Sequence, residues 1–261
     1  MKLQNYNNKK LCKDSVYLYI KTGYRKQLSY YDCIYSIFYI HNETINIWSH
    51  LATSILFMIL YINNITNNIT NNNIANTYLL VSSFGFLSSS IFHIFVCNKN
   101  YYKFALCIDS TGMFTNIFIS VYSSLLNILS NKFLINYYNF YIIFYIIYIF
   151  IAYLIFIKKI IQTNHVTHIS QSLAILTSIF YYKLPLFHLY FISKNDFLII
   201  YNRWISMCIM WVFSFFIFGI RLPERFISYK FDYILNSHNI FHLLISYCAW
   251  IHYNTLYNLN T

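Results

Sequence analysis

The sequence predicts an all-α membrane protein built as a seven-transmembrane helix bundle. Of its 261 residues, 58% are hydrophobic and only 10% are charged, which is unusual for a surface that faces water. Apolar runs long enough to cross about 30 Å of hydrocarbon recur along the chain, with short polar segments between them. Basic residues concentrate between alternate runs, as they do in proteins that span a bilayer several times.

The chain divides into a short basic segment and a membrane domain. Residues 1–14 are basic and Asn-rich and contain no apolar stretch of the signal-peptide kind, and residues 1–45 are predicted to be a cytosolic tail followed by a pre-helix segment. Residues 46–257 form the predicted membrane domain. Its seven helices are predicted at 46–63, 76–97, 104–126, 133–157, 168–188, 197–220 and 237–257. The fourth run is rich in β-formers, but its length and the Lys158-Lys159 pair after it favour a helix ending at an interface.

The 18 Lys and Arg residues predict the orientation. With a cytosolic amino terminus, all but four of them fall on the cytosolic side. The four on the other side are Lys132, Lys183, Lys194 and Arg203. This asymmetry predicts a cytosolic amino terminus and, after seven crossings, an extracytosolic carboxyl terminus. The sequons at Asn64 and Asn68 then face away from the cytosol, where glycans are added, although such matches arise by chance in an Asn-rich chain.

Two alternative classes are not favoured. The net charge of +11 comes from scattered residues and forms no basic stripe, so no nucleic-acid partner is predicted. The six cysteines show no CxxC pair and no framework spacing, so neither a thiolate metal site nor a disulfide scaffold is predicted.

His238 and His242 form an HxxxH pair, which places both imidazoles on one face of the last helix. The pair alone is a weak signal, because histidines at a helix start are often interfacial or packing residues. The predicted topology strengthens it. His93 ends the second helix and Asp109 opens the third on the same side of the membrane, so all four groups share one depth.

Three histidines and a carboxylate at one depth have the composition of a catalytic zinc site with an open position for water. Imidazole suits Zn²⁺ better than Ca²⁺ or Mg²⁺, and availability favours zinc over iron or copper. Asp109 would bind or orient the water; the alternative is a polar group that joins two helices. Ser89, one turn before His93, would polarise the water or a substrate carbonyl, or simply pack between helices. Four of the other histidines are interpreted as interfacial residues: His41, His165, His168 and His188. His252 lies about 15 Å along the helix from His242 and is too far away to share the metal.

Several motifs together resemble the progestin and adipoQ receptor (PAQR) family, which includes adiponectin-receptor-like and haemolysin III proteins. They are HNETINIWSH at 41–50, SSIFH at 89–93, DSTG at 109–112, RLPERF at 221–226 and SHNIFH at 237–242. The resemblance implies a seven-helix bundle in which His93, His238 and His242 hold a zinc ion, with a water bridging to Asp109. Glu43, Asn46 and His50 match the first motif and are interpreted as capping or interhelical residues.

The resemblance also implies a function, namely zinc-dependent hydrolysis of a lipid amide in the manner of a ceramidase. A membrane lipid is then the partner, in a membrane that the sequence does not identify. Two other classes stay open: a cytolytic, pore-forming protein of the haemolysin III kind, and a receptor in which zinc is structural. Small predicted outer loops make the receptor class less favoured.

Overall fold

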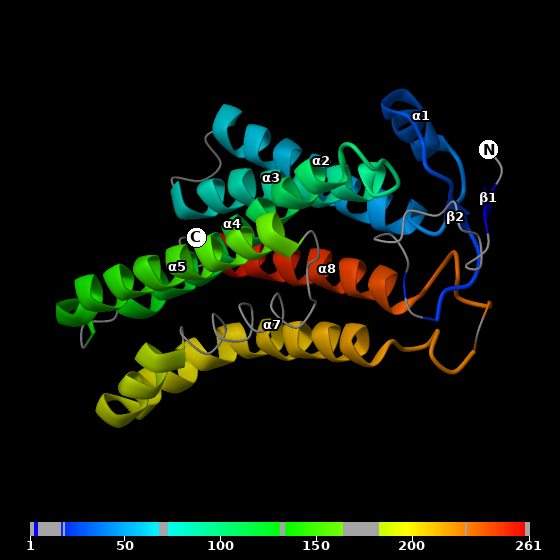
Figure 1. Ribbon diagram of the computed structural model, residues 1–261. Helices are drawn as coiled ribbons and strands as arrows, with labels where there is room; N and C mark the ends of the chain where they lie inside the picture. The colour runs from blue at the N-terminus through cyan, green and yellow to red at the C-terminus, as the bar shows by residue number, and fades with distance from the viewer. Residues whose placement is uncertain are drawn as a thin grey trace. The chain divides into compact units, whose positions relative to one another are not determined.

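The computed structural model describes residues 3–4, 17, 19–67, 73–130, 134–163, 183–227 and 229–258. Long helices dominate this part of the chain (Figure 1). They are α2 (Thr44–Thr66), α3 (Asn73–Phe95), α4 (Tyr102–Leu129), α5 (Tyr138–Thr163), α7 (Lys194–Ile220) and α8 (Ser237–Tyr257). The short 3-10 helix η3 (Ile135–Tyr137) leads into α5. The protein is therefore an all-α, multi-pass integral membrane protein, as predicted.

Among the described residues, four helical stretches are long and apolar enough to cross a membrane: α2, α3, α4 and Ile135–Gln162. A fifth arises if the two parts of α7, Lys194–Asn202 and Trp204–Ile220, form one span bent by 52°. The predicted run 237–257 is helical as α8 but is less apolar, because three histidines and several Asn and Ser residues interrupt it. Most of the predicted run 168–188 lies outside the described residues, although 183–192 is helical. Seven crossings and the orientation of the termini thus stay predictions.

The segment before α2 has regular structure of its own. Strand β1 (Leu3–Gln4) pairs antiparallel with β2 (Tyr24–Arg25) (Figure 1). Helix α1 (Tyr30–Tyr35) begins after Ser29, whose hydroxyl accepts a hydrogen bond from the Asp32 amide, as N-cap serines do. The 3-10 helix η2 (Ser36–Phe38) follows directly. The chain thus approaches α2 through ordered structure.

The chain forms two compact units, and several helices contribute to both. The first comprises Met1–Leu56, Ser83–Met113 and Met210–Cys248; the second comprises Phe57–Ser82, Phe114–Ile209 and Ala249–Thr261. All five predicted site residues belong to the first unit. A buried cluster of Leu28, Cys33, Ile47, Ile94 and Cys97 packs the pre-helix segment against α2 and the end of α3.

Within the first unit, α3 and α4 approach each other closely at Gly112. A Cβ atom added to Gly112 would lie 2.6 Å from the Ser88 Cβ and 3.1 Å from the Gly85 carbonyl oxygen. Small residues at a helix contact let the two backbones come together, as is common in membrane helices. Gly112 lies one turn after Asp109, so this contact brings the Asp109 carboxylate towards α3.

The second unit is held by buried polar pairs. The Asn64 amide donates to the Asn76 Oδ1 at 3.0 Å and to the Tyr253 hydroxyl at 3.2 Å. Asn64, the asparagine of the first glycosylation sequon, is therefore buried in α2. Asn68, the asparagine of the second, lies outside the described residues. His252 lies in this unit, with its Nε2 2.8 Å from the Ser123 hydroxyl.

Candidate metal site

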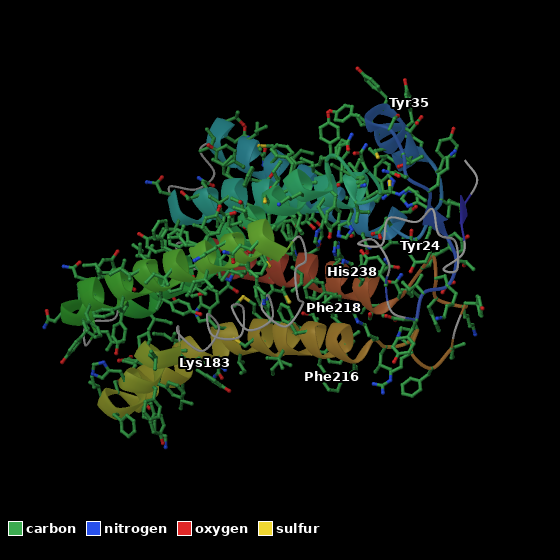
Figure 2. The ribbon with its side chains drawn as sticks, in the orientation of Figure 1. Tyr24, Tyr35, Lys183, Phe216, Phe218 and His238 are labelled. Atoms are coloured by element: carbon green, nitrogen blue, oxygen red, sulfur yellow. The ribbon has the colours of Figure 1, made fainter. Side chains whose placement is uncertain are left out.

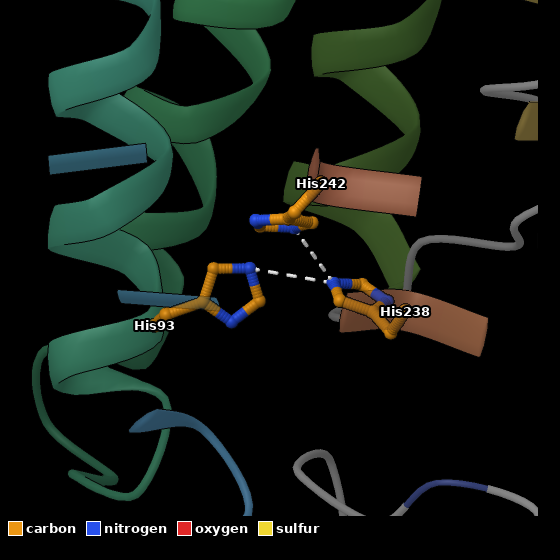
Figure 3. Close-up of side chains that lie close together, drawn as sticks. All are labelled: His93, His238 and His242. Atoms are coloured by element: carbon orange, nitrogen blue, oxygen red, sulfur yellow. Dashed lines mark hydrogen bonds between the residues drawn. The ribbon is translucent and has the colours of Figure 1, made fainter. Parts of the chain in front are cut away.

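Three histidines from two helices converge in the first unit (Figure 3). The His238 Nε2 lies 3.4 Å from the His93 Nε2 and 3.0 Å from the His242 Nε2. Each histidine offers one ring nitrogen, and these three atoms all lie within 4.8 Å of one another. His93 and His242 are buried and His238 is half-buried. The structure thus brings together the three histidines that the sequence analysis selected.

His93 sits in the last turn of α3, where the carbonyl groups have no partners within the helix. The buried guanidinium of Arg25 donates to the His93 carbonyl oxygen and, at 3.0 Å, to that of Ile94. It also donates to the Ser36 hydroxyl at 2.7 Å. A cation at a helix C-terminus is favoured by the helix dipole. Arg25 therefore fixes the end of the helix that presents His93.

His238 is the second residue of α8, and a buried carboxylate fixes the start of that helix. Glu224 accepts hydrogen bonds from the Ser237 backbone N–H, at 2.7 Å, and from the Ser237 hydroxyl. A carboxylate on the first amides of a helix satisfies donors that lack partners within the helix. His242 follows one turn later and therefore lies on the same face as His238.

A carboxylate orients the His93 ring. The His93 Nδ1 lies 2.9 Å from the Glu43 Oε2, and both side chains are almost fully buried. Burial alone would raise the pKa of Glu43, but the His93 hydrogen bond and the nearby Arg25 charge outweigh it and lower this pKa. Glu43 is therefore an ionised acceptor for the proton on the His93 Nδ1, and Nε2, on the other side of the ring, faces His238.

Asp109 and Ser89 lie beside the cluster. Asp109 is half-buried two turns into α4, and its carboxylate is hydrogen bonded to the Ser89 side chain and interacts electrostatically with His93. Asp109 is thus a neighbour of the three histidines, separate from the group whose nitrogens converge. Ser89 contacts the carboxylate, and its role in polarising the water or a substrate carbonyl stays a prediction.

The donor set fits a metal ion. Three imidazole nitrogens at bonds of about 2.0–2.1 Å around a tetrahedral ion lie roughly 3.3 Å apart. Two of the three separations in the cluster, 3.0 and 3.4 Å, are close to this value, and all three atoms lie within 4.8 Å of one another. Paired nitrogens at such distances, with lone pairs facing one another, need a proton or a cation between them. Imidazole donors suit transition metals rather than Ca²⁺ or Mg²⁺.

Aromatic rings surround the cluster. The His50 ring stacks on His242 with centroids 3.7 Å apart, and Phe86 meets His50 edge-on. The Phe218 and Tyr17 rings each lie 5.2 Å from the His238 ring, and Figure 2 shows Phe218 beside His238. Burial, and then the nearby Glu43 carboxylate, raises the pKa of Tyr17, so its hydroxyl keeps its proton and can donate to Glu43.

Three other histidines that the structure describes lie outside the cluster. His41 lies before α2, the His188 Nδ1 lies 3.2 Å from the Tyr141 hydroxyl, and His252 pairs with Ser123. His165 and His168 lie outside the described residues. The sequence did not predict three contacts of the site: that of Arg25 with the end of α3, that of Tyr17 with His238, and that of Glu43 with His93. The motif containing Glu43 was a signal, and it was interpreted as helix capping and interhelical hydrogen bonding, without a link to the metal site.

The fold and the cluster define a multi-pass helical membrane protein with a buried three-histidine group able to hold a metal ion. The haemolysin-III related family model matches residues 38–253, and the chain belongs to this family, as the PAQR resemblance predicted. It is 27% identical to human progestin and adipoQ receptor family member 3, over 92% of this chain and 80% of that protein. It is 33% identical to Arabidopsis thaliana heptahelical transmembrane protein 1 over 40% of this chain and 35% of that protein.

An uncharacterized protein of Schizosaccharomyces pombe is also similar. It is 28% identical over 93% of this chain, and the match covers 57% of the yeast protein's own length. The similarity to these relatives extends well beyond the histidine motifs.

Proposed function

We propose that this protein is a zinc-dependent hydrolase that acts on a lipid amide, in the manner of a ceramidase. The observation that supports the proposal is the convergence of the His93, His238 and His242 nitrogens beside the Asp109 carboxylate. Three neutral ligands leave a coordination position open, which is the arrangement of catalytic rather than structural zinc.

His93, His238 and His242 would hold the ion. Zinc bound there would lower the pKa of a water molecule towards 7 and polarise an acyl carbonyl. Asp109 would accept a hydrogen bond from that water, orient it and receive its proton as the water oxygen bonds to the acyl carbon. Asp109 would then pass the proton to the amine nitrogen as the C–N bond breaks. Ser89, through its hydrogen bond, would keep the Asp109 carboxylate turned towards the histidines.

The proposed substrate is a membrane lipid because the site lies near the ends of apolar helices. His93 is two residues from the end of α3, a helix that is apolar enough to span a bilayer. A lipid whose amide lies at the interface between hydrocarbon and water would reach such a depth with its acyl chains still in the bilayer.

The test is hydrolysis of lipid amides by purified, zinc-loaded protein. We expect fatty-acid release from a ceramide by the wild type, and a loss of about 10²–10⁴-fold in rate for Asp109→Asn, since a positioned base contributes that much. The zinc content of the variant should not change. Asp32→Asn alters an exposed carboxylate that bonds to Ser29, so it is the matched control and should keep full activity.

Three outcomes would overturn the proposal. Folded, metal-loaded protein with no turnover on a panel of lipid amides and esters would contradict hydrolysis. Release of dye from lipid vesicles that survives Asp109→Asn, without fatty-acid release, would favour the pore-forming class. Binding of an extracellular protein by a variant without hydrolysis would favour the receptor class.

A further inference from the structure

Glu43 is a buried carboxylate whose position is unusual for the start of a helix. It immediately precedes α2 (Thr44–Thr66), where a carboxylate commonly caps the first amides. Here the Glu43 backbone N–H donates to the His41 Nδ1 at 3.1 Å, and the His41 backbone N–H donates to the Thr44 hydroxyl at 2.8 Å. Local contacts thus hold the start of α2, and the Glu43 carboxylate is directed instead at α3.

Two buried groups converge on one oxygen of this carboxylate. The Glu43 Oε2 lies 2.9 Å from the His93 Nδ1 and accepts a bond of 2.7 Å from the Asn46 amide. Asn46 is itself held by the Asn239 amide of α8, which donates to its Oδ1 at 2.7 Å. The Tyr17 hydroxyl is a further partner of the carboxylate. The position of Glu43 is therefore fixed from three directions.

The opposite nitrogen of His93 faces the other two histidines. The His93 Nε2 is 3.4 Å from the His238 Nε2, while Nδ1 is occupied by Glu43. A metal-binding histidine commonly donates its other ring N–H to a carboxylate, which fixes its tautomer and ring orientation and makes its free nitrogen a better donor.

We propose that Glu43 is a positioning residue that fixes the tautomer and orientation of His93 for metal binding. The inference rests on the proposed metal site, and it gives a role to a residue that has no ligand function of its own. Glu43 would increase metal affinity without touching the ion. The segment before α2, which supplies Glu43 and Tyr17, is then part of the site.

The test measures zinc affinity by competition with a chromophoric chelator, and the visible spectrum of the Co²⁺-loaded protein. Partners of metal-binding histidines typically contribute 10–100-fold in affinity. We expect Glu43→Ala to weaken zinc binding by about 100-fold and to change the Co²⁺ spectrum, because the His93 ring loses its orientation. Glu43→Gln keeps the shape and an acceptor but loses the charge, so a loss of about 10-fold is expected.

Ser54→Ala is the matched structural control. It removes a buried hydrogen bond between α2 and α3, which the Ser54 hydroxyl donates to the Ser83 carbonyl oxygen at 2.8 Å, and leaves the Glu43–His93 pair and its partners in place. We expect lower thermal stability with wild-type zinc affinity. Should Ser54→Ala weaken binding as much as Glu43→Ala, the effect of Glu43 would be general to the fold and the inference would be wrong.

The remaining outcomes separate the inference from the proposed function. Wild-type affinity and an unchanged Co²⁺ spectrum in both Glu43 variants would overturn the role of Glu43 and leave the metal site intact. A wild type that binds neither Zn²⁺ nor Co²⁺ would overturn both. If Glu43→Ala does not fold, Glu43→Gln decides the question by the same two readouts.

Discussion

His41 shows how burial and hydrogen bonding fix the protonation of one side chain near the start of α2. Its ring is fully buried, its Nε2–H donates to the Ser36 carbonyl oxygen at 3.1 Å, and its Nδ1 accepts from the Glu43 amide. A second proton on Nδ1 would break the bond from Glu43. Burial, and then the positive charge of Arg25, lower the pKa of His41 to about 4. The negative charge of Glu43 acts in the opposite direction but is outweighed.

This pKa predicts a pH dependence of stability. Above the usual value of about 6.5, His41 is neutral in both states and contributes no slope. Between pH 6.5 and 4 only the unfolded chain takes up a proton, so stability falls as the pH falls, by up to about 3 kcal/mol. Thermal unfolding of the wild type and His41→Gln from pH 7.5 to 4 measures the difference in slope. Equal slopes for the two proteins would contradict the prediction.

At this scale the sequence predicted the convergence of the three histidines better than the contacts around them. His238 and His242 are one helical turn apart, so their proximity follows from spacing alone. Glu43 and His93 are fifty positions apart, and their contact depends on how α2 packs against α3. Arg25 was counted as a topological charge, because no local pattern indicates that a basic residue of the tail caps α3.

At the scale of elements, the contact between α3 and α4 decides whether Asp109 reaches the histidines. Ser89 and His93 lie on α3, and Asp109 and Gly112 lie on α4. The space at Gly112 is closed by Ser88, one position before Ser89. A side chain at Gly112 must therefore push the two helices apart near the carboxylate.

Gly112→Ala should destabilise the protein by about 1–3 kcal/mol, the usual cost of overpacking, and should reduce lipid hydrolysis by displacing Asp109. Ser88→Gly removes the two nearest atoms and should restore part of both losses. Gly219→Ala is the matched control, since its Cβ would meet nothing within 4 Å. Thermal unfolding and fatty-acid release measure the effects. Equal stability of Gly112→Ala and Gly219→Ala would show that the close approach has no energetic role.

Helix positions were largely predictable, because apolar length is a local property. The predicted runs 46–63, 104–126 and 237–257 correspond to α2, α4 and α8. Structure before α2 was not predicted. Its short elements depend on contacts such as that of Asp232, whose carboxylate accepts from the Lys21 and Thr22 amides more than two hundred residues away.

At the scale of the whole molecule, the question is whether α8 crosses the membrane. It is not among the described helices that are apolar enough by composition. Its polar residues have partners inside the protein, however: Asn239 bonds to Asn46, and His252 bonds to Ser123. Polar groups satisfied in this way are tolerated at membrane depth, so composition underestimates such a helix.

We therefore expect the termini on opposite sides of the membrane, with the amino terminus cytosolic. Epitope tags at the two ends, probed in intact and permeabilised cells, measure this. The carboxyl-terminal tag should be accessible in intact cells when the protein is in the plasma membrane, and the amino-terminal tag only after permeabilisation. Two tags on the same side would mean an even number of crossings.

The central claim is that His93, His238 and His242 form one metal site, and the most direct test is the zinc-to-protein ratio of purified protein. The wild type should contain one zinc per chain and His238→Ala almost none, because two nitrogens hold the ion far more weakly than three. His252→Ala removes a buried histidine outside the cluster and should keep its zinc. Zinc retained in His238→Ala at the wild-type ratio would contradict the account.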